Sequence, residues 1–427
     1  MTEKQLNWSG FYKKSIAERH QLLASGNLLS PETLLSLQKE DLLNLETANQ
    51  MSENVIGRLT LPFSIVPDFI VNAKTYHLPY VTEEPSVVAA ASYAAKLIGR
   101  AGGFQAEIKN RQMIGQVALY DVPNLESAQA AIMHETESLI EKANLAYPSI
   151  VKRGGGARRI SLTIKDQFLI VYLTVDTQEA MGANMVNTMM EALVDDLIDL
   201  SKGKPLMAIL SNYATESLVT ATCQVPFHYL SRDKVEAKEL ANKMGLASQL
   251  AQVDPYRAAT HNKGIFNGID AIVLATGNDW RAIESGAHAY ASKDGLYKGL
   301  TTWHADFETE MIKGTITIPM PIATKGGSIG LNPSVVIAHD LLNQPTAKEL
   351  SMIIASVGLA QNFAAIKALT NKGIQAGHMK LHAKSLAMLA GASSAETPQL
   401  LQLLLKEKHM NLETTKVLLQ SLRNKKI

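Results

Sequence analysis

The chain of 427 residues contains one cysteine, Cys223. A single thiol excludes an intrachain disulfide and a thiolate cluster for zinc or iron–sulfur, which agrees with a reducing cytoplasm. The N-terminal residues lack an apolar signal core, and no uninterrupted apolar stretch approaches the roughly 20 residues of a spanning helix. The sequence therefore predicts a cytoplasmic protein without a membrane anchor.

The chain also lacks an excess of charge of either sign. It has 41 basic and 40 acidic residues, and hydrophobic residues make up 46% of it. This balance provides no attraction to nucleic acid or to an anionic membrane, so small molecules are the expected partners. The length exceeds that of one compact core, and we expect two domains and a terminal appendage.

A Gly-x-Gly-x-x-Gly fingerprint is absent, so a Rossmann-type dinucleotide site is not supported. A different segment suits a phosphate, because it joins four cations to a flexible backbone. It reads Lys152-Arg153-Gly154-Gly155-Gly156-Ala157-Arg158-Arg159. A solvated basic loop is the alternative interpretation.

Hydrophobic periodicity and turn residues indicate alternating helices and strands. Residues 1–50 predict a helical lead-in, with Ser30 as an N-cap before Pro31. The other expected elements outside residues 112–216 are strands over 59–66, 71–80 and 271–275, helices over 86–98 and 347–369, and a final helical stretch over 378–427 that follows a hinge at Gly373 and Gly377.

Residues 112–216 have a different pattern of strand and helix signals, which predicts an inserted smaller domain. Its expected elements are strands over 115–120 and 168–175 and helices over 125–146 and 184–200. The second strand leads through Gly182 into a helix, whose exposed first amides could hold a phosphate.

Four separated blocks each place an ionisable group among small residues. They contain Glu84, Lys263, Asp279 and His378. Two carboxylates, an ammonium and an imidazole are able to exchange protons and stabilise an oxyanion, which indicates carbonyl chemistry.

Each group also has a structural alternative. Glu84 could be a helix N-terminal carboxylate, Lys263 a solvated lysine in a polar loop, and Asp279 a turn aspartate at a strand end. His378 could cap the last helix. Its spacing from His382 permits a metal, but no third ligand is evident, so no metal is expected.

Five blocks in order along the chain closely resemble class II hydroxymethylglutaryl-CoA reductases of bacteria. These blocks are Glu53-Asn54-Val55-Ile56-Gly57, Glu84-Pro85-Ser86-Val87-Val88-Ala89-Ala90, Glu179-Ala180-Met181-Gly182-Ala183-Asn184-Met185-Val186-Asn187, Gly277-Asn278-Asp279-Trp280-Arg281-Ala282 and Gly377-His378-Met379. The resemblance implies reduction of hydroxymethylglutaryl-CoA to mevalonate and CoA by two hydride transfers from a nicotinamide cofactor, in the mevalonate route to isoprenoids.

The resemblance assigns catalytic roles to the four groups. Lys263 would stabilise the thioester and aldehyde oxygen, and Glu84 would donate the proton to the carbonyl. Asp279 would couple Glu84 and Lys263, and His378 would protonate the CoA thiolate.

The resemblance also implies three sets of binding residues. Ser86, Arg257 and Asn267 would hold the hydroxymethylglutaryl portion, and Arg257 would pair with its free carboxylate. Glu53, Asn54 and Gln361 would lie near CoA. The nicotinamide cofactor would contact Met181, Gly182, Ala183, Asn184 and Asn187, with Lys152 and Arg153 nearby.

Two details bear on the cofactor. Glu179 stands where the family commonly has aspartate, and no aspartate immediately precedes the triple glycine, where Lys152 and Arg153 follow Ala146-Tyr147-Pro148. Cations near the ribose favour the additional phosphate, so we expect NADPH, with NADH as the alternative.

The expected fold is α+β. A large substrate-binding, CoA-binding and dimerisation domain (1–111 and 217–373) is interrupted by a small NAD(P)-binding domain (112–216) and followed by a helical C-terminal flap (377–427). The resemblance further implies a homodimer with shared active sites. The alternatives are another acyl-CoA or aldehyde reductase, and a non-catalytic CoA-binding protein.

Overall fold

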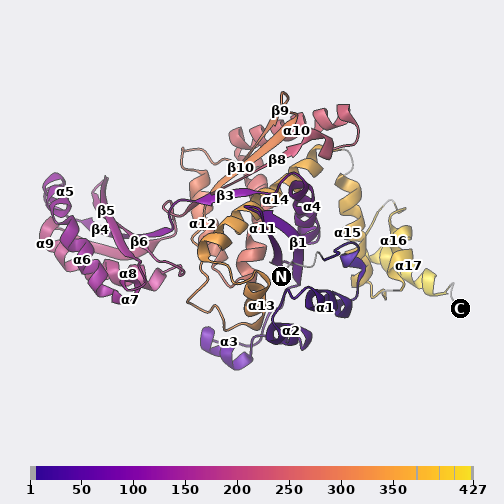
Figure 1. The fold of residues 1–427 in the computed structure, drawn as a ribbon, viewed down its shortest axis with the longest axis horizontal. Helices are drawn as coiled ribbons and strands as arrows, with labels where there is room; N and C mark the ends of the chain where they lie inside the picture. Colours follow the sequence, from indigo (N-terminus) through magenta and orange to yellow (C-terminus); the bar gives the residue numbers. More distant parts are fainter. Residues whose placement is uncertain (1–5, 372–373, 394, 408, 425–427) are drawn as a thin grey trace.

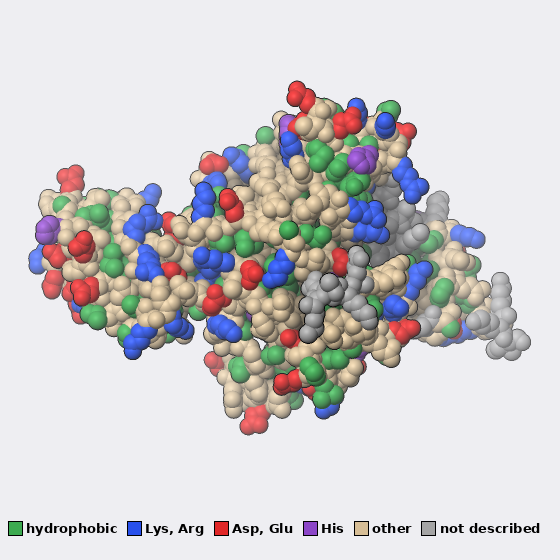
Figure 2. Space-filling view, in the orientation of Figure 1, with side chains coloured by type: hydrophobic (Ala, Val, Ile, Leu, Met, Phe, Trp, Pro, Cys, Tyr) green, Lys and Arg blue, Asp and Glu red, His purple; other side chains and the backbone are tan. Residues whose placement is uncertain are grey.

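The computed structural model describes residues 6–371, 374–393, 395–407 and 409–424, without the side chains of 374–381. It mixes helices and sheets in three parts (Figure 1). We call residues 112–211 the lobe, the other elements up to residue 371 the body, and the helices after residue 373 the C-terminal bundle. Figure 2 shows the lobe joined to the body by a narrow waist.

Short helices begin the chain, as the sequence predicts. Ser30 caps the second of the three α-helices, and Pro31 is its first residue. Leu23 and Leu29 from this segment are buried against Ile337 and Leu341 of the body. The elements are η1 (Phe11–Lys13), α1 (Ile16–Ser25), α2 (Pro31–Gln38) and α3 (Leu45–Met51).

The body contains a two-stranded antiparallel sheet and a four-stranded antiparallel sheet of order β3-β8-β10-β9. Its helices pack with both sheets around the larger hydrophobic core. The elements are β1 (Phe63–Val71), β2 (Lys74–Val81), α4 (Val87–Arg100), β3 (Gln105–Ile108), β8 (Leu218–Pro226), η2 (Phe227–Tyr229), α10 (Lys234–Val253), α11 (Pro255–Ala275), α12 (Trp280–Ala291), β9 (Thr301–Asp306), β10 (Met311–Pro319), α13 (Pro333–Leu341) and α14 (Ala347–Thr370).

Helix α14 is the central helix of the body. Thr346 and Glu349 form a capping box at its start, which satisfies backbone amides that the first turn leaves unpaired. It is the one described helix with the length and composition to cross a membrane, with a mean hydropathy of 1.5, but 72% of that apolar stretch is buried inside the molecule. The body therefore uses this apolar surface as core.

The lobe has its own antiparallel sheet, of order β5-β6-β4-β7, and its own hydrophobic core. Alternate residues of β6 are buried, because successive strand side chains point to opposite faces. The elements are β4 (Gln112–Tyr120), α5 (Leu125–His134), α6 (Thr136–Ala146), α7 (Pro148–Val151), β5 (Gly156–Lys165), β6 (Phe168–Asp176), α8 (Ala183–Ala192), α9 (Val194–Ser201) and β7 (Lys204–Ser211).

The C-terminal bundle comprises α15 (Ile374–Leu389), α16 (Thr397–Leu404) and α17 (Leu412–Asn424). Its buried side chains include Ala383, Leu400, Leu404 and Leu419, which form a cluster separate from the other cores. Helix α15 runs through Gly377, so this glycine does not separate two elements as the sequence predicts. Gly373 lies outside the described residues.

Two predicted strands are wrong in position or type. The first begins at Phe63 rather than at residue 59, because an extended, exposed segment that contains Pro62 precedes it. Residues 271–275 are the last turn of α11, not a strand. A short apolar run fits a buried strand and a buried helix equally well, and here it is buried within a helix of 21 residues.

Candidate active site

Glu84 and Lys263 meet although 179 positions separate them in the sequence. Glu84 lies in the connection between β2 and α4, Lys263 lies on α11, and its Nζ is 2.5 Å from Glu84 Oε2. The two side chains are 44% and 60% exposed. An exposed ion pair contributes only about 0–1 kcal/mol to stability, so fold stability alone does not account for this arrangement.

A pocket of about 310 Å³ lies beside this pair along α11. Lys263, Asn267 and Asp270 share one face of the helix, because residues four and seven apart are close in angle around its axis. The lining residues are Ala259, Lys263, Phe266, Asn267, Asp270, Glu284, His288 and Tyr297. We call this the α11 pocket.

Buried polar contacts hold the turn of α11 that carries Lys263. The His261 imidazole lies 2.6 Å from Thr301 Oγ1 and 3.2 Å from the Asn362 amide nitrogen. The Trp303 indole donates to Asn362 Oδ1 at 2.8 Å. Burial lowers the pKa of His261 to about 4, so its ring is neutral at pH 7.

Asn262 completes this attachment. Its side chain accepts from the Leu300 amide at 2.9 Å and donates to the Lys298 carbonyl at 2.9 Å. The sequence predicts a polar loop over residues 261–268, and this is wrong, because all of them lie within α11. The polar side chains at 261 and 262 are buried in bonds to other elements, so their polarity does not indicate a loop.

Asp270 and Glu284 form an acidic pair that sequence reasoning missed. Burial, the charge of Glu284 and a hydrogen bond with it together raise the pKa of Asp270 to about 8. Within the described ranges, Asp270 Oδ1 is buried without a hydrogen-bond partner. The signal was the spacing of seven residues from Lys263 on the same helix face.

Asp279 is the N-cap of α12 and does not follow a strand. Its carboxylate accepts from the amides of Arg281 and Ala282, at 3.1 and 3.2 Å. The preceding turn is fixed by Gly277, whose φ is +70°, and by His339, whose Nε2 lies 3.1 Å from the Thr276 carbonyl. The described contacts of Asp279 thus explain its position but do not join it to Glu84 or Lys263.

Ser86, a predicted substrate residue, has strained backbone geometry. Its φ is +76°, and it begins α4 without using its hydroxyl as a cap. Such a conformation costs a non-glycine residue about 1–3 kcal/mol. Ser86 thus begins α4 two residues after Glu84, at an energetic cost that its hydroxyl does not offset by capping the helix.

The other predicted substrate residues, Arg257 and Asn267, both lie on α11. Arg257 is half-buried in the first turn, which Asp254 caps through the Arg257 amide at 3.0 Å. Asn267 lines the α11 pocket one turn after Lys263. One helix thus carries both of these residues together with Lys263.

The three predicted CoA residues do not come together. Glu53 and Asn54 lie in the exposed turn that follows α3, which Figure 1 shows well apart from α4 and α11. Gln361 is only 4% exposed and donates to the Val87 carbonyl at 3.4 Å. Gln361 thus lies beneath the start of α4, and its contact with CoA stays a prediction.

The predicted cofactor residues surround the start of α8. Gly182 has a φ of +87°, and a Cβ added there would lie 2.4 Å from Thr177 Cγ2, so the position requires glycine. Met181, Gly182 and Ala183 are half-buried, and Asn184 is exposed. The Asn187 side chain instead accepts from the Leu210 amide at 2.8 Å and fixes β7.

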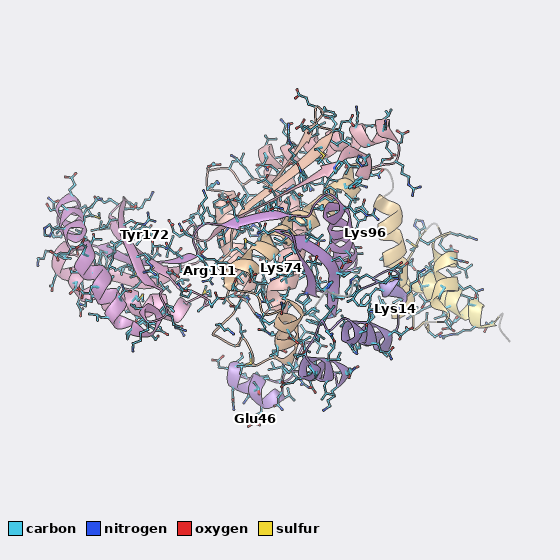
Figure 3. All side chains as sticks on the ribbon, viewed as in Figure 1. Lys14, Glu46, Lys74, Lys96, Arg111 and Tyr172 are labelled. Atoms are coloured by element: carbon cyan, nitrogen blue, oxygen red, sulfur yellow. The ribbon has the colours of Figure 1, made fainter. Side chains whose placement is uncertain are left out.

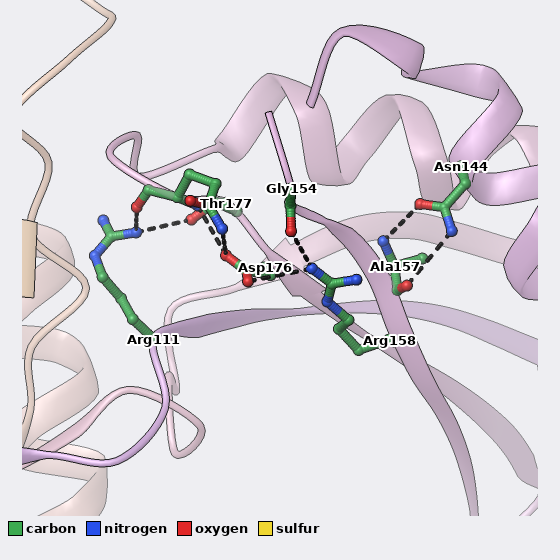
Figure 4. Close-up of polar contacts among 8 residues, drawn as sticks. Arg111, Asn144, Gly154, Ala157, Arg158, Asp176 and Thr177 are labelled. Carbon is green, nitrogen blue, oxygen red and sulfur yellow. Dashed lines mark hydrogen bonds and ion pairs between the residues drawn. The ribbon is translucent and has the colours of Figure 1, made fainter. Parts of the chain in front are cut away.

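The basic segment surrounds the triple glycine in the sequence, and Figure 4 shows the contacts of Arg158 within it. Arg158 donates to the Gly154 carbonyl and lies 3.4 Å from Asp176. Arg159 pairs with Glu216 at 2.7 Å. Lys152 and Arg153 are exposed without an ion pair in the described part of the chain, so they are the two cations open to an anion.

His378 lies within α15, and its side chain is outside the described residues. The helix begins at Ile374, so His378 does not open it as the sequence predicts. Within the described ranges, no group of three His, Cys, Asp or Glu side chains is arranged to hold a metal ion.

Residues 326–330 read Gly-Gly-Ser-Ile-Gly and match the Gly-x-Ser-x-Gly pattern of a nucleophile elbow. An elbow requires a sharp turn from a strand directly into a helix. Here the residues lie in turns between β10, which ends at Pro319, and α13, which begins at Pro333. The match is therefore not an elbow.

Comparison with known families matches residues 15–383 to the family described as hydroxymethylglutaryl-coenzyme A reductase. The 3-hydroxy-3-methylglutaryl-coenzyme A reductase of Archaeoglobus fulgidus is 41% identical over 97% of this chain and 94% of its own length. A probable reductase of the same name from Borreliella burgdorferi is 36% identical over 89% of this chain and 86% of its own length.

Solved structures give the same result. The Streptococcus pneumoniae reductase superposes with a TM-score of 0.86 at 61% identity, covering 97% of this chain and all of that one. A class II structure from the same organism, described as bound to NADPH in open conformations, has a TM-score of 0.85 at 62% identity and covers 86% of this chain and all of its own.

Proposed function

This chain belongs to the hydroxymethylglutaryl-coenzyme A reductase family, and we propose that it reduces (S)-3-hydroxy-3-methylglutaryl-CoA to (R)-mevalonate and CoA. The observation that carries the proposal is the 2.5 Å contact between Lys263 and Glu84 beside the α11 pocket. The reaction consumes two hydrides and two protons and releases the thiol of CoA. Its product, mevalonate, belongs to the mevalonate route to isoprenoids.

NADPH is the proposed reductant, and it supplies both hydrides when bound. The residues present fit it, because Gly182 brings the backbone close at the start of α8 and the exposed Lys152 and Arg153 can meet a phosphate. The related class II structure from Streptococcus pneumoniae holds NADPH, which supports the same choice here. The lobe is therefore the proposed cofactor-binding domain.

Lys263 is the proposed electrostatic catalyst. Its ammonium would stabilise negative charge on the thioester oxygen and later on the aldehyde oxygen, charge that is larger in the transition state than in the substrate. Glu84, already in contact with Lys263, would deliver the proton that completes each carbonyl reduction.

Asp279 and His378 are the proposed partners of this pair. Asp279 would support the charge on Lys263, and His378 would protonate the departing CoA thiolate, carried by a C-terminal bundle that acts as the flap. We expect His378→Gln to reduce turnover of the thioester far more than turnover of free mevaldehyde. Equal losses on both substrates would contradict the role of His378.

The substrate would lie across α11 and the start of α4. Arg257 would pair with the free carboxylate, and Ser86 and Asn267 would bind the polar groups of the hydroxymethylglutaryl portion. The CoA arm would approach Glu53 and Asn54 only from another subunit, because they lie in the turn after α3, and α3 lies well apart from α11 within one chain (Figure 1). This is one reason to propose shared active sites.

A homodimer is the proposed assembly. The segment after α3 is extended and exposes Ile56 and Leu59 by 104% and 91%. Apolar side chains gathered on one exposed segment favour burial against a partner. Sedimentation velocity should give a species of twice the 46.4 kDa chain mass, and Ile56→Glu should shift it toward the monomer. The dimer is proposed to work in the cytoplasm.

The deciding experiment follows absorbance of the reduced nicotinamide with hydroxymethylglutaryl-CoA and either NADPH or NADH. We expect oxidation of about two reductant molecules for each CoA released, and a higher kcat/KM with NADPH. A higher value with NADH would contradict the cofactor choice. Turnover of other acyl-CoA esters instead would favour a different reductase, and no oxidation at all would favour a non-catalytic CoA-binding protein.

A further inference from the structure

The lobe and the body are joined by polar contacts centred on Arg111, the residue before β4. Figure 3 shows Arg111 at the boundary between the two parts. A polar cavity of about 150 Å³ lies at the same place, lined by Lys109, Asn110, Arg111, Gln112, Asp176, Gln178, Glu179 and Lys348. The boundary is therefore a polar and charged contact, not a continuation of either core.

Arg111 binds both sides of this boundary, although it is only 6% exposed. On the lobe side its guanidinium donates to Thr177 Oγ1 at 3.2 Å and to the Ala180 carbonyl at 2.9 Å. On the body side it donates to the Ile322 carbonyl. The Arg111 guanidinium thus fixes residues 177–182, which we call the cofactor loop, relative to the irregular segment that follows β10.

Glu179 makes a second set of contacts across the same boundary. Its Oε2 accepts from Thr324 Oγ1 at 2.5 Å and from the Ala347 amide, at the first turn of α14, at 2.7 Å. Its own carbonyl accepts from the Thr324 amide at 2.9 Å. A carboxylate is favoured at that helix start, because the first amides are unpaired and carry partial positive charge.

Segment 322–324 extends these contacts to the turn that carries Asp279. Asn278 accepts from the Ala323 amide at 2.7 Å and donates to the Ala323 carbonyl at 3.0 Å. Ala323 lies between Ile322, bound by Arg111, and Thr324, bound by Glu179. Three consecutive residues therefore connect the cofactor loop to the residue next to Asp279.

We propose that Arg111 and Glu179 are positioning residues that, through segment 322–324, couple the cofactor loop 177–182 to the Asp279 turn. The proposal rests on the proposed function and deepens it. Occupation of the cofactor loop restricts Glu179 and Thr324, which restricts Ala323 and Asn278, so bound cofactor favours the arrangement of Asp279 that the substrate needs. By linkage, bound substrate favours cofactor binding by the same factor.

Glu179→Gln tests the coupling, because it removes the charge at α14 and keeps the side-chain length. Calorimetric titration measures the Kd of hydroxymethylglutaryl-CoA with and without NADP⁺, a pair of ligands that does not react. For the wild type we expect NADP⁺ to tighten binding by about 5-fold or more. For Glu179→Gln we expect the ratio to fall to within twofold of one, with the Kd for the substrate alone unchanged.

Three further variants separate coupling from general damage. Glu310→Gln breaks an exposed 2.7 Å ion pair with Lys238 elsewhere on the body, and it should keep the wild-type ratio. Thr324→Val removes one contact of Glu179 and keeps the Ala347 cap, so it should lower the ratio even if Glu179→Gln does not fold. Glu179→Asp keeps the charge on a shorter chain and should restore part of the ratio.

Three results would overturn the coupling. The first is an affinity ratio of one in the wild type, and the second is an unchanged ratio in both Glu179→Gln and Thr324→Val. The third is a parallel loss of affinity for each ligand alone, which would show a merely structural role. Failure of the proposed function is distinct, since the wild type would then not oxidise NADPH with hydroxymethylglutaryl-CoA.

Discussion

The two halves of the candidate site are held in different ways. On the body, Lys263 follows two side chains, His261 and Asn262, that are 1% and 0% exposed and bonded to other elements. On the lobe, the cofactor loop is held by Gly182 in a left-handed conformation and by contacts with Arg111 and Glu179 beside a polar cavity.

This difference separates a rigid surface from an adjustable one. Buried polar networks are strengthened by the low local dielectric, and breaking one leaves unpaired groups that cost about 1–3 kcal/mol each. Glu179 is half-buried beside the polar cavity, where water can replace a broken contact at lower cost. We therefore expect the helix α11 to fix the reacting carbonyl and the loop to adapt to the cofactor.

Substitution of Lys263 should give the largest effect. Lys263→Met keeps the apolar stem and removes the ammonium, so we expect kcat to fall by about 10³-fold, or about 4 kcal/mol in the transition state. Steady-state kinetics should show this with little change in the Kd of NADPH, because the lobe is untouched. Lys238→Met, which removes an exposed ion pair with Glu310, is the matched control.

The free energies of unfolding of Asn362 and Asn187 variants compare the support of the body with that of the lobe. Asn362→Leu leaves Thr301 and the Trp303 indole without their buried acceptor, and we expect a loss of about 3 kcal/mol in urea unfolding. Asn187→Leu in the lobe removes one bond to a backbone amide and should cost about 1 kcal/mol. Equal losses of unfolding free energy in the two variants would contradict the view that the body is rigid and the lobe is adjustable.

Gly182→Ala should act mainly on the cofactor side. The added Cβ would lie 2.4 Å from Thr177 Cγ2 at a φ of +87°, which costs about 2 kcal/mol. We expect the KM for NADPH to rise about tenfold while the Kd of hydroxymethylglutaryl-CoA alone stays within twofold. A larger loss on the substrate side would mean that the loop is part of the rigid surface.

Asp270 should give the smallest effect and a pH dependence of known sign. Its pKa is raised to about 8 in the folded chain, above the ordinary aspartate value of 3.8. The folded state therefore binds more protons between these values, and this group's contribution to stability falls as pH rises from about 4 to 8. Asp270→Asn removes this slope, so relative to the wild type the variant should be more stable at pH 9 than at pH 5.

Thermal unfolding at pH 5 and pH 9 measures this change. Asp294→Asn, which removes an exposed partner of Lys298, is the control and should leave the slope unchanged. A slope in the Asp270→Asn protein equal to that of the wild type would show that the acidic pair is not the source.

Much of the element order was predictable from local signals. The Ser30 cap, the long helix α14 and the helix after Pro85 are each specified by residues within a few positions. The α11 segment was not predictable in this way. Its polar residues at 261 and 262 are bonded to residues 298–301, at and just before the start of β9, and to α14, and its last apolar turn has no strand-specific signal.

The candidate site was also predictable from the sequence only in part. Nothing local to Glu84 or Lys263 indicates that they meet, and their pairing followed only from resemblance to a family. Asp270 could have been found from its spacing along α11. Glu179 could not, because the sequence places it beside the cofactor block, whereas its side chain is directed to α14 and Thr324.

The C-terminal bundle has a mechanical consequence. Its buried side chains, among them Leu400, Leu404 and Leu419, pack against one another. A rotation of the three helices as one unit would therefore keep this apolar surface dry. The bundle could move relative to the body many times without breaking any of these described contacts.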